Sequence, residues 1–331
     1  IHIVLLILSL LLSICCGAVN ISISEICSSL YKCFTHPESM TLNERIFMNI
    51  RLPRALLCLI VGASLAVGGT MMQALFRNPI VEPGLIGTSS GAAFGAALYF
   101  VLGVVFKLGD SEWTLPIAAC IGGLFSTALV FLLSQSKQTG RSSIVGLLLT
   151  GIAVNALFMS GVGFLSYVAR DPQARSITFW GLGSLTGANW HSVTVTGITT
   201  AICVVAGLRY AKHLNALMLG EDEALFLGVN VNRLKVIVVL INVIMVAVAT
   251  AFVGVISFVG LIVPHLLRIM NGSDNRYLIR NSVLLGGIIL SLSDFTARMI
   301  LRPAELPIGI VTSVIGVPVF IILLRRKNYF F

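Results

Sequence analysis

Apolar positions in this chain form long runs that are separated by short polar or basic segments. A helix that crosses a bilayer needs about 20 mostly apolar residues. The predicted spans, about ten in number, are 2–19, 53–75, 85–106, 114–134, 142–168, 191–209, 233–256, 258–270, 281–298 and 306–325. The eighth is short, and its separation from the seventh is the least defined boundary. The pattern predicts an all-α membrane protein.

The first segment, 2–19, has two interpretations. It is short and ends in Cys15-Cys16-Gly17-Ala18, as a secretory signal can. No Lys or Arg precedes it, and a spanning helix gives an even number of spans that fits the charge pattern below. We therefore favour a first spanning helix. Because the sequence starts with Ile, we expect its native start to lie upstream.

Composition argues against one large soluble core. The 331 residues are 57% hydrophobic and only 11% charged, with a mean hydropathy of +0.99, whereas soluble domains carry about 25% charged residues. No Pro/Ser-rich linker or low-complexity tract divides the chain. We therefore predict a single polytopic transmembrane domain over 1–331.

The net charge of +9 is better explained by membrane topology than by nucleic-acid binding. Cytoplasmic loops of membrane proteins carry an excess of Lys and Arg. With the N-terminus inside, the predicted loops place 13 of the 22 basic residues on the cytoplasmic side and 9 outside. This bias predicts that both termini are cytoplasmic, and it leaves an outer basic cluster that needs its own explanation.

The stretch 254–265 is apolar enough for a membrane, yet it is interrupted. Gly254 and Gly260 permit close backbone approach, and Pro264 lacks an amide donor. His265 places a titratable group beside the break. Backbone groups that are freed in lipid must find partners inside the protein or line a cavity. Broken helices often mark the path of a transporter, so we predict that this segment lies inside a bundle.

The longest predicted inner loop, 210–232, combines acidic and apolar residues. It predicts two short helices hinged at Gly220, the second with acids at its positive dipole end and a glycine cap at its C-terminus. The helices would lie on the membrane surface or dock into a groove of a cytoplasmic partner. Acids disfavour an anionic lipid surface, so we favour docking. The residues concerned are Leu217, Met218, Gly220, Glu221, Asp222, Glu223, Leu225, Phe226 and Gly228.

The sequence lacks a built-in energy source. It contains no Gly-Lys pair, and therefore no phosphate-binding loop of an ATPase. Acids within the spans are scarce, and Asp294 near the outer end of its helix is the main case, whereas ion-coupled carriers usually need intramembrane ionisable groups. A transporter of this composition would draw its energy from a partner. The alternatives are an ion-coupled secondary transporter of a small solute, an intramembrane enzyme and a membrane anchor.

The seven cysteines show no zinc-ligand spacing, and we predict no metal site. Five of them fall in predicted spans, where a free Cys usually packs as a small apolar residue. Cys27 and Cys33 lie in the first outer loop, where they could form a disulfide that nothing else requires.

Small residues recur at four-residue spacing within several spans, as they do where membrane helices pack closely. The pairs are Gly62 with Ala66, Gly91 with Gly95, and Gly122 with Ser126. The spacing is common in membrane proteins and predicts only a packed bundle.

Five segments match a known family in order and spacing over nearly the whole chain. They are Arg51-Leu-Pro-Arg54, Gly69-Thr-Met-Met-Gln-Ala-Leu-Phe-Arg-Asn-Pro79, Glu82-Pro-Gly-Leu-Ile-Gly87, the stretch 254–265, and Ala304-Glu-Leu-Pro-Ile-Gly309. Together they resemble the permease family of binding-protein-dependent ABC importers for iron-siderophores, haem and vitamin B12.

This resemblance implies a type II ABC importer permease fold, in which a homodimer of ten-helix subunits surrounds a path at its two-fold axis in the bacterial cytoplasmic (inner) membrane. Two copies of a separate cytoplasmic ATPase would bind ATP and Mg. A periplasmic or surface-anchored binding protein would deliver a metal chelate, whether ferric siderophore, haem or cobalamin, for transport by alternating access. The chain itself would be no enzyme, hold no cofactor and bind no nucleic acid.

The resemblance also implies roles for particular residues. Loop 212–229 corresponds to the coupling helices that seat on the ATPase. The outer basic cluster corresponds to the docking site for acidic residues of the binding protein. For Arg51 and Arg54 the alternative is that they anchor the chain at the membrane interface. The docking residues are Arg51, Arg54, Arg298 and Arg302. The inner-gate residues are Thr88, Ser89, Ser90, Ser142 and Ser143, of which Ser142 suits a helix cap equally well.

Overall fold

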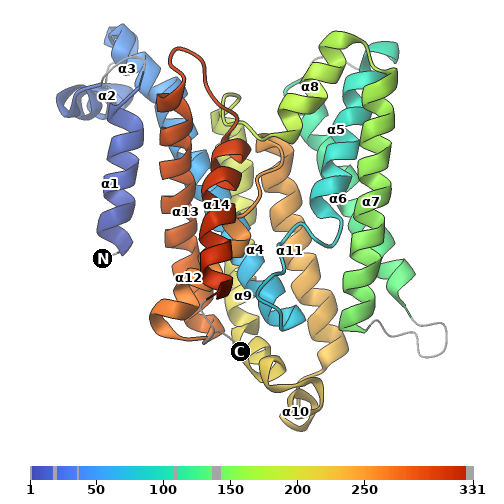
Figure 1. Ribbon diagram of the computed structural model, residues 1–331. Helices are drawn as coiled ribbons and strands as arrows, with labels where there is room; N and C mark the ends of the chain where they lie inside the picture. The colour runs from blue at the N-terminus through green and yellow to red at the C-terminus, as the bar shows by residue number, and fades with distance from the viewer. Residues whose placement is uncertain (1, 18–20, 36, 107–110, 136–142, 326–331) are drawn as a thin grey trace.

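The computed structural model describes residues 2–17, 21–35, 37–106, 111–135 and 143–325. Within these ranges the fold is helical, as predicted, and the long helices run side by side as a bundle (Figure 1). The long helices are α1 (His2–Cys15), α4 (Leu52–Phe76), α5 (Thr88–Val105), α6 (Thr114–Ser134), α7 (Ile144–Val168), α9 (Trp190–Leu219), α11 (Val231–Val253), α12 (Val259–Asn271), α13 (Asn275–Ile300) and α14 (Ile308–Arg325). The shorter elements are α2 (Ile23–Thr35), η1 (Pro37–Ser39), α3 (Leu42–Ile46), η2 (Phe47–Arg51), α8 (Asp171–Gly181) and α10 (Glu221–Phe226).

Among the described residues, six helices are long and apolar enough, by length and composition, to cross a membrane. They are Leu42–Phe76, Thr114–Ser134, Ile144–Val168, Trp190–Leu219, Val231–Val253 and Asn275–Ile300. Shorter apolar helices lie at the four remaining predicted spans, at His2–Cys15, Thr88–Gly103, Val259–Asn271 and Ile308–Ile322. The chain is therefore a multi-pass membrane protein.

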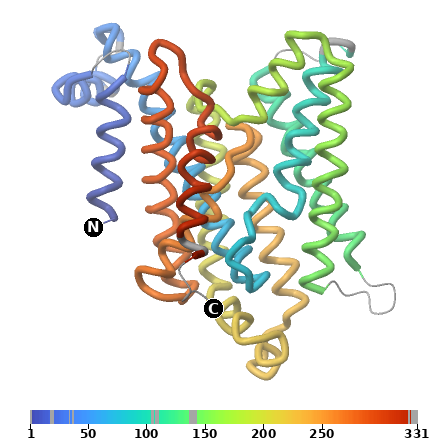
Figure 2. The backbone as a smooth tube through the Cα atoms, in the orientation of Figure 1, coloured from blue at the N-terminus to red at the C-terminus, as the bar shows by residue number. Residues whose placement is uncertain are grey.

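The two ends of the bundle carry different short elements (Figure 2). The elements α2, α3 and α8 lie at the end drawn at the top, together with the start of α4 and the last turn of α13. The short helix α10 lies at the opposite end. Following the predicted topology, we call these the outer and the inner end.

The buried helix α4 lies in the core and contacts α13, α9, α12 and α11. Its crossing with α13 depends on glycine, because a Cβ on Gly62 would overlap the carbonyl of Gly286, and a Cβ on Gly286 would overlap that of Gly62. Gly91 of α5 and Gly122 of α6 oppose each other in the same way. These contacts confirm the close packing predicted from the small residues.

The chain breaks between α11 and α12, as predicted. The first of these helices ends at Val253, Gly254 follows with φ of 75°, and α12 begins at Val259. A Cβ on Gly254 would overlap the carbonyl oxygen of Trp180. The N–H of Ser184 donates to the carbonyl of Val253 at 2.8 Å. The carbonyl of Val253, which is freed at the break, therefore has a hydrogen-bond donor inside the protein. Lipid cannot supply such a donor.

We predicted two short helices hinged at Gly220. The prediction is wrong for the first helix, before Gly220. Residues up to Leu219 continue α9, which therefore extends well beyond the predicted end at 209. Only α10 is a separate short helix. Leu217 is fully buried against the bundle, so its apolar side chain extends the core rather than starting a surface element.

The disulfide that the sequence permits between Cys27 and Cys33 is not formed. Both residues lie on α2, six positions apart, and both are free thiols. A helical rise of about 1.5 Å per residue separates their Cα atoms by about 9 Å along the axis. This exceeds the span of about 7 Å that a disulfide can bridge.

Candidate functional site

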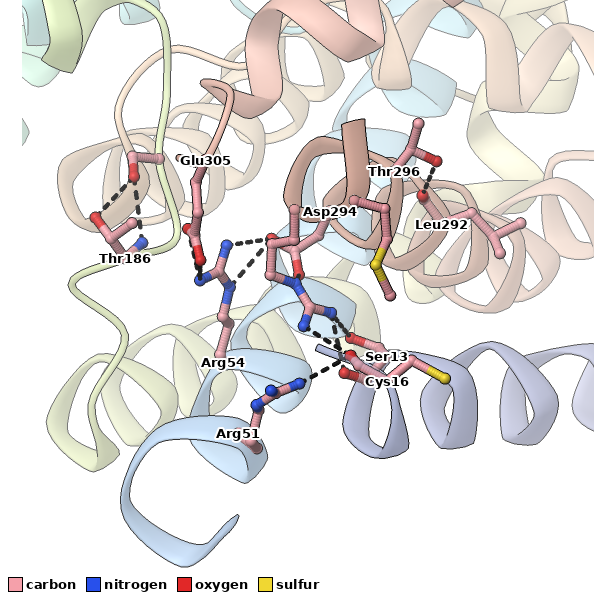
Figure 3. A network of polar contacts seen from close by, with 12 residues as sticks. Ser13, Cys16, Arg51, Arg54, Thr186, Leu292, Asp294, Thr296 and Glu305 are labelled. Carbon is pink, nitrogen blue, oxygen red and sulfur yellow. Dashed lines mark hydrogen bonds and ion pairs between the residues drawn. The ribbon is translucent and has the colours of Figure 1, made fainter. Parts of the chain in front are cut away.

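A network of arginines and acids lies at the outer end, where α4 begins and α13 ends (Figure 3). Arg54 donates from Nε and Nη2 to Oδ1 of Asp294, at 3.1 and 2.8 Å. From Nη1 it donates to the two carboxylate oxygens of Glu305, at 3.1 and 2.9 Å. Arg298 donates from Nε to Oδ2 of Asp294 at 2.9 Å. One carboxylate therefore holds two guanidinium groups side by side.

Asp294 is the fixed centre of this network, because it is only 1% exposed. A buried charge is costly unless it is paired and hydrogen-bonded, and the two arginines supply partners for both of its oxygens. Arg298 is also buried, and its Nη2 donates to the carbonyl oxygen and the Oγ of Ser13 at 2.9 Å each. The network therefore ties α1 to α4 and α13. Removal of one buried partner typically costs about 3–5 kcal/mol.

The other two predicted docking residues lie beside this network. Arg51 donates from Nη1 to the carbonyl oxygen of Cys16 at 2.8 Å. Arg302 is exposed, and its guanidinium contacts the sulfur of Met299. The fold thus brings all four arginines to the outer end, although the two bound to Asp294 use most of their N–H groups within the chain. Their role in docking stays a prediction.

The inner end carries an exposed apolar patch on and around α10, which we define as Leu219, Leu225, Phe226 and Leu227. Phe226 is 92% exposed. The helix is held against the bundle by an ion pair of 2.9 Å between Oε2 of Glu221 and Nζ of Lys235. These apolar side chains project from the end of the bundle. Exposed apolar patches of this kind are typical of interaction surfaces.

The remaining predicted coupling residues lie around α10 but outside the exposed apolar patch. Met218 is half-buried and accepts a hydrogen bond at its sulfur from Nδ2 of Asn275, 3.0 Å away. Gly220 has φ of 150°, and a Cβ there would overlap the carboxylate of Glu223. Gly228 has φ of 81° and follows the helix end. Asp222 and Glu223 are exposed in the first turn.

A polar clamp joins the inner end of α9, just before α10, to the start of α13. Oδ1 of Asn215 accepts from the backbone N–H and from Nδ2 of Asn275, at 2.8 Å each, and Nδ2 of Asn215 donates to Asp274 at 2.8 Å. Hydrogen bonds from Arg276 and Asn215 hold the pKa of Asp274 well below its ordinary value. The same helix, α13, carries Asp294 near its other end.

A cavity of about 290 Å³ lies beside the broken segment. Residues 255–257 and the 82–85 loop form part of its wall, and α5, α7, α8 and Leu65 of α4 form the rest. Polar groups at Ser89, Ser90 and Asn155 interrupt a mostly apolar lining. Apolar walls with a few placed polar groups are typical of a small-molecule site, which makes this cavity the candidate segment of a transport path.

The predicted gate residues at the start of α5 lie on or behind this cavity. Thr88 is fully buried and pairs its Oγ1 with that of Thr127 at 3.0 Å. The Oγ of Ser90 donates to Oδ1 of Asn155 at 2.5 Å, and Nδ2 of Asn155 donates to the carbonyl of Leu85 at 2.7 Å. The hydroxyl groups therefore pin the start of α5 to α6 and α7. Gating itself stays a prediction.

Of the other two gate residues, Ser143 caps α7 by accepting from the N–H of Gly146 at 2.9 Å, and Ser142 lies outside the described residues. Residues 87–91 spell Gly-Thr-Ser-Ser-Gly, which matches the letters of a hydrolase nucleophile elbow. That elbow requires a strand before the serine, whereas here a loop leads into a helix.

Pro264 leaves the carbonyl of Gly260 without its usual helical donor, and a side chain of α4 replaces it. Gln73 donates from Nε2 to the carbonyls of Gly260 and Leu261, at 3.4 and 3.2 Å. Oε1 of Gln73 accepts from Arg268, one turn further along α12. A buried amide therefore compensates for the missing donor, and α12 continues through Pro264 rather than breaking there, as the sequence had suggested; the break lies at 254–258.

The start of α12 is also fixed. Phe258 has φ of 70°, and its N–H donates to Oε1 of Glu82 at 2.7 Å. His265 is 4% exposed within the same helix. Sequence reasoning missed Gln73, Glu82 and Asn155 as individual residues. The available signal was an isolated polar side chain inside or next to an apolar run, which in a membrane domain needs a partner.

This arrangement defines a class of protein, a multi-pass membrane transport subunit with a cavity beside a broken helix. The chain belongs to the FecCD transport family, whose sequence profile matches residues 5–326. The hemin transport system permease protein HmuU of Yersinia pestis is 42% identical over 283 residues, which cover 86% of this chain and 84% of that protein. The cobalamin import system permease protein BtuC of Halobacterium salinarum is 38% identical over 279 residues, which cover 84% and 73%.

A solved structure has the same fold. It shows a metal-chelate type ABC transporter in an inward-facing conformation, with a TM-score of 0.85, 33% identity and coverage of 98% of this chain and 97% of that one. The relatives are permease subunits of ABC transporters, which supports a transport subunit rather than an enzyme. The predicted family resemblance is thereby confirmed.

Proposed function

We propose that this chain is the permease subunit of an ATP-driven importer of a metal chelate, and that it works by alternating access. Ten helices of each subunit would span the bacterial cytoplasmic membrane with both termini inside, and two subunits would form the path between them. A cytoplasmic ATPase in two copies would supply the energy, and an external binding protein would deliver the chelate.

The observation that carries this proposal is the placement of two different surfaces at opposite ends of one bundle. The arginine network lies at the outer end and the apolar α10 patch at the inner end. The cavity beside the broken segment lies in the same domain. A transporter that is loaded from one side and driven from the other needs such an arrangement.

The docking roles divide among the residues according to their exposure. At the inner end, Leu225 and Phe226 are exposed and would enter a groove of the ATPase, while the buried Leu217 would support them from behind. At the outer end, the exposed Arg302 and the half-buried Arg51 would meet the binding protein alongside Arg54. Charge pairs at such an interface act more on the rate and orientation of docking than on affinity.

The helix α13 supplies a physical link between the two ends. It is clamped to the inner end of α9 through Asn275 and Asn215, and near its outer end Asp294 holds Arg54 and Arg298. A displacement of α10 would therefore reach the outer network through a single rigid helix. This is a route for coupling ATP hydrolysis to the outer face.

The test is uptake into proteoliposomes that contain this chain with its ATPase and binding protein. Labelled haem, cobalamin and a ferric siderophore are offered in competition. Haem is the first candidate, because the hemin permease noted above shares 42% identity with this chain. We expect uptake of one chelate that stops when the ATPase is omitted or ATP is withheld.

Uptake that persists without the ATPase would overturn the proposal and favour an ion-coupled carrier. An ATPase-dependent system that takes up none of the three chelates would keep the class of transporter and reject these cargoes. Charge reversal of Arg51 and Arg302 together, which do not bind the buried Asp294, tests the docking assignment. We expect it to lower ATPase stimulation by the binding protein, and unchanged stimulation would contradict that assignment.

A further inference from the structure

Glu305 lies in the outer loop 301–307, between α13 and α14, and the proposed docking assigns it no role of its own. Its side chain is 37% exposed, and it binds Nη1 of Arg54 with both carboxylate oxygens. The Nε and Nη2 groups of the same guanidinium donate to Asp294. Arg54 is therefore held between a buried carboxylate on one side and a partly exposed one on the other.

The carboxylates of Asp294 and Glu305 differ in how readily they can dissociate from Arg54. Asp294 is 1% exposed and shared by two arginines, and breaking a buried pair strands a charge in a dry environment. Glu305 sits on a loop and faces solvent, where an ion pair adds little to stability. The contact between Glu305 and Arg54 is thus the exchangeable half of the network.

We propose that Glu305 occupies the position of a partner's carboxylate, and that docking of the external binding protein exchanges Glu305 for an acidic side chain of that protein on Nη1 of Arg54. Asp294 holds the guanidinium in place throughout the exchange. This inference rests on the proposed function. It specifies the contacting chemistry of the partner, an acidic side chain on a projecting surface that can reach a half-buried arginine.

The charges of the network fit an exchange. Arg54 and Arg298 carry two positive charges, and Asp294 and Glu305 carry two negative ones, so these four side chains are formally neutral and the neighbouring Arg51 adds one positive charge. When Glu305 leaves, one positive charge faces outward. The chain's own carboxylate therefore keeps Arg54 ordered and screened until a partner with matching geometry replaces it.

The loop that carries Glu305 leads into the start of α14, which is hydrogen-bonded to the segment after α8. The N–H groups of Ile308 and Gly309, at the start of α14, donate to the carbonyls of Gly183 and Leu182, at 3.1 and 3.0 Å. Gly181, at the end of α8, lines the cavity wall. The segment that follows the Glu305 loop is thus adjacent to the end of α8 at the cavity wall.

The test measures the dissociation constant and association rate of the binding protein on the complete permease–ATPase complex in lipid nanodiscs. We expect Glu305→Gln to tighten binding roughly two- to five-fold, the range of a partly exposed ion pair. The matched control is Glu112→Gln, which removes the same charge from the outer end at a residue that contacts Asn189 instead. We expect the control to leave the dissociation constant unchanged.

Two further variants make each outcome decisive. Glu305→Asp keeps the charge but shortens the side chain by one methylene, so it should weaken the contact with Arg54 and give a smaller gain. Arg54→Glu should weaken docking. If Arg54→Glu weakens docking while neither Glu305 variant tightens it, the exchange is overturned and the proposed function stands.

An equal gain from Glu112→Gln would also overturn the exchange, because it would reveal a general charge effect. If Arg54→Glu leaves docking unchanged, the docking assignment of the proposed function fails instead, and the exchange fails with it.

Discussion

The side-chain amide of Gln73 donates to the carbonyl of Gly260, 3.4 Å away, and so replaces the backbone donor that Pro264 lacks. The two partners come from α4 and α12, which are far apart in the sequence. Helix α12 therefore continues through Pro264 because a neighbouring helix supplies the missing hydrogen bond. The stability of α12 around Pro264 and the packing of α4 against α12 depend on each other.

The first prediction concerns this amide. Gln73→Leu should lower the free energy of unfolding by about 1–3 kcal/mol, because it leaves buried carbonyls without a donor. Pro264→Ala restores a backbone N–H that can reach Gly260, so the penalty for Gln73→Leu should shrink in that background. The measurement is a double-mutant cycle by denaturant titration in detergent micelles. Additive effects of the two substitutions would contradict the proposed compensation.

The second prediction concerns the crossing of α4 and α13. Gly62→Ala should destabilise the protein by about 1–3 kcal/mol, because its Cβ would overlap the backbone of Gly286 and force the helices apart. The matched control is Gly163→Ala on α7, where an added Cβ has no neighbour within 4 Å. The control should be neutral or stabilising. Equal melting temperatures for both variants would refute a glycine-dependent crossing.

The third prediction concerns the inner patch. Phe226→Ser should weaken binding of the ATPase by about 2 kcal/mol or more, as expected for an aromatic anchor at the centre of an interface. Tyr167→Ser on α7 is the control, since Tyr167 is 88% exposed on a different helix. Affinity is measured by titrating the purified ATPase onto the permease in nanodiscs. A similar loss in the control would show that exposure alone, rather than the α10 patch, determines the effect.

The fourth prediction concerns pH. Because the pKa of Asp274 is lowered in the folded protein, its stabilising contribution is complete well above the unfolded value of about 3.9 and is lost as the pH falls below that value. Asp274→Asn should therefore lower the melting temperature more at pH 7 than at pH 3. The side chain is 40% exposed, so the effect at pH 7 should stay below about 1 kcal/mol. If Asp274→Asn lowered the melting temperature more at pH 3 than at pH 7, the stabilising role of the Asp274 carboxylate would be rejected.

Much of the architecture follows from the sequence because membranes impose a simple rule. A helix satisfies its own backbone hydrogen bonds, so a long apolar run in lipid has essentially one structure available to it. The predicted spans therefore coincide with helices, including the two that flank the break after Gly254. The motifs at 51–54 and 304–309 indicated the family through their residues and their order along the chain.

Helix ends were less well predicted, because contacts with distant residues decide them. Residues 210–219 were expected in an inner loop with a separate short helix before Gly220, and the burial of Leu217 against the bundle instead extends α9 to Leu219. The amphipathic helix α2 was not predicted, and it separates Cys27 from Cys33. Neither outcome can be inferred from local composition, since both depend on surfaces supplied by other segments.

The sequence by itself determined the class of fold, the position of the break and the presence of charged residues at both ends. Only the tertiary structure decided which charges are paired. Arg54 and Arg298 stand in the sequence as basic residues of an outer cluster, and the folded chain binds both to the buried Asp294 and one also to Glu305. An ion pair depends on distance and burial, which appear only when α4, α13 and the loop 301–307 come together.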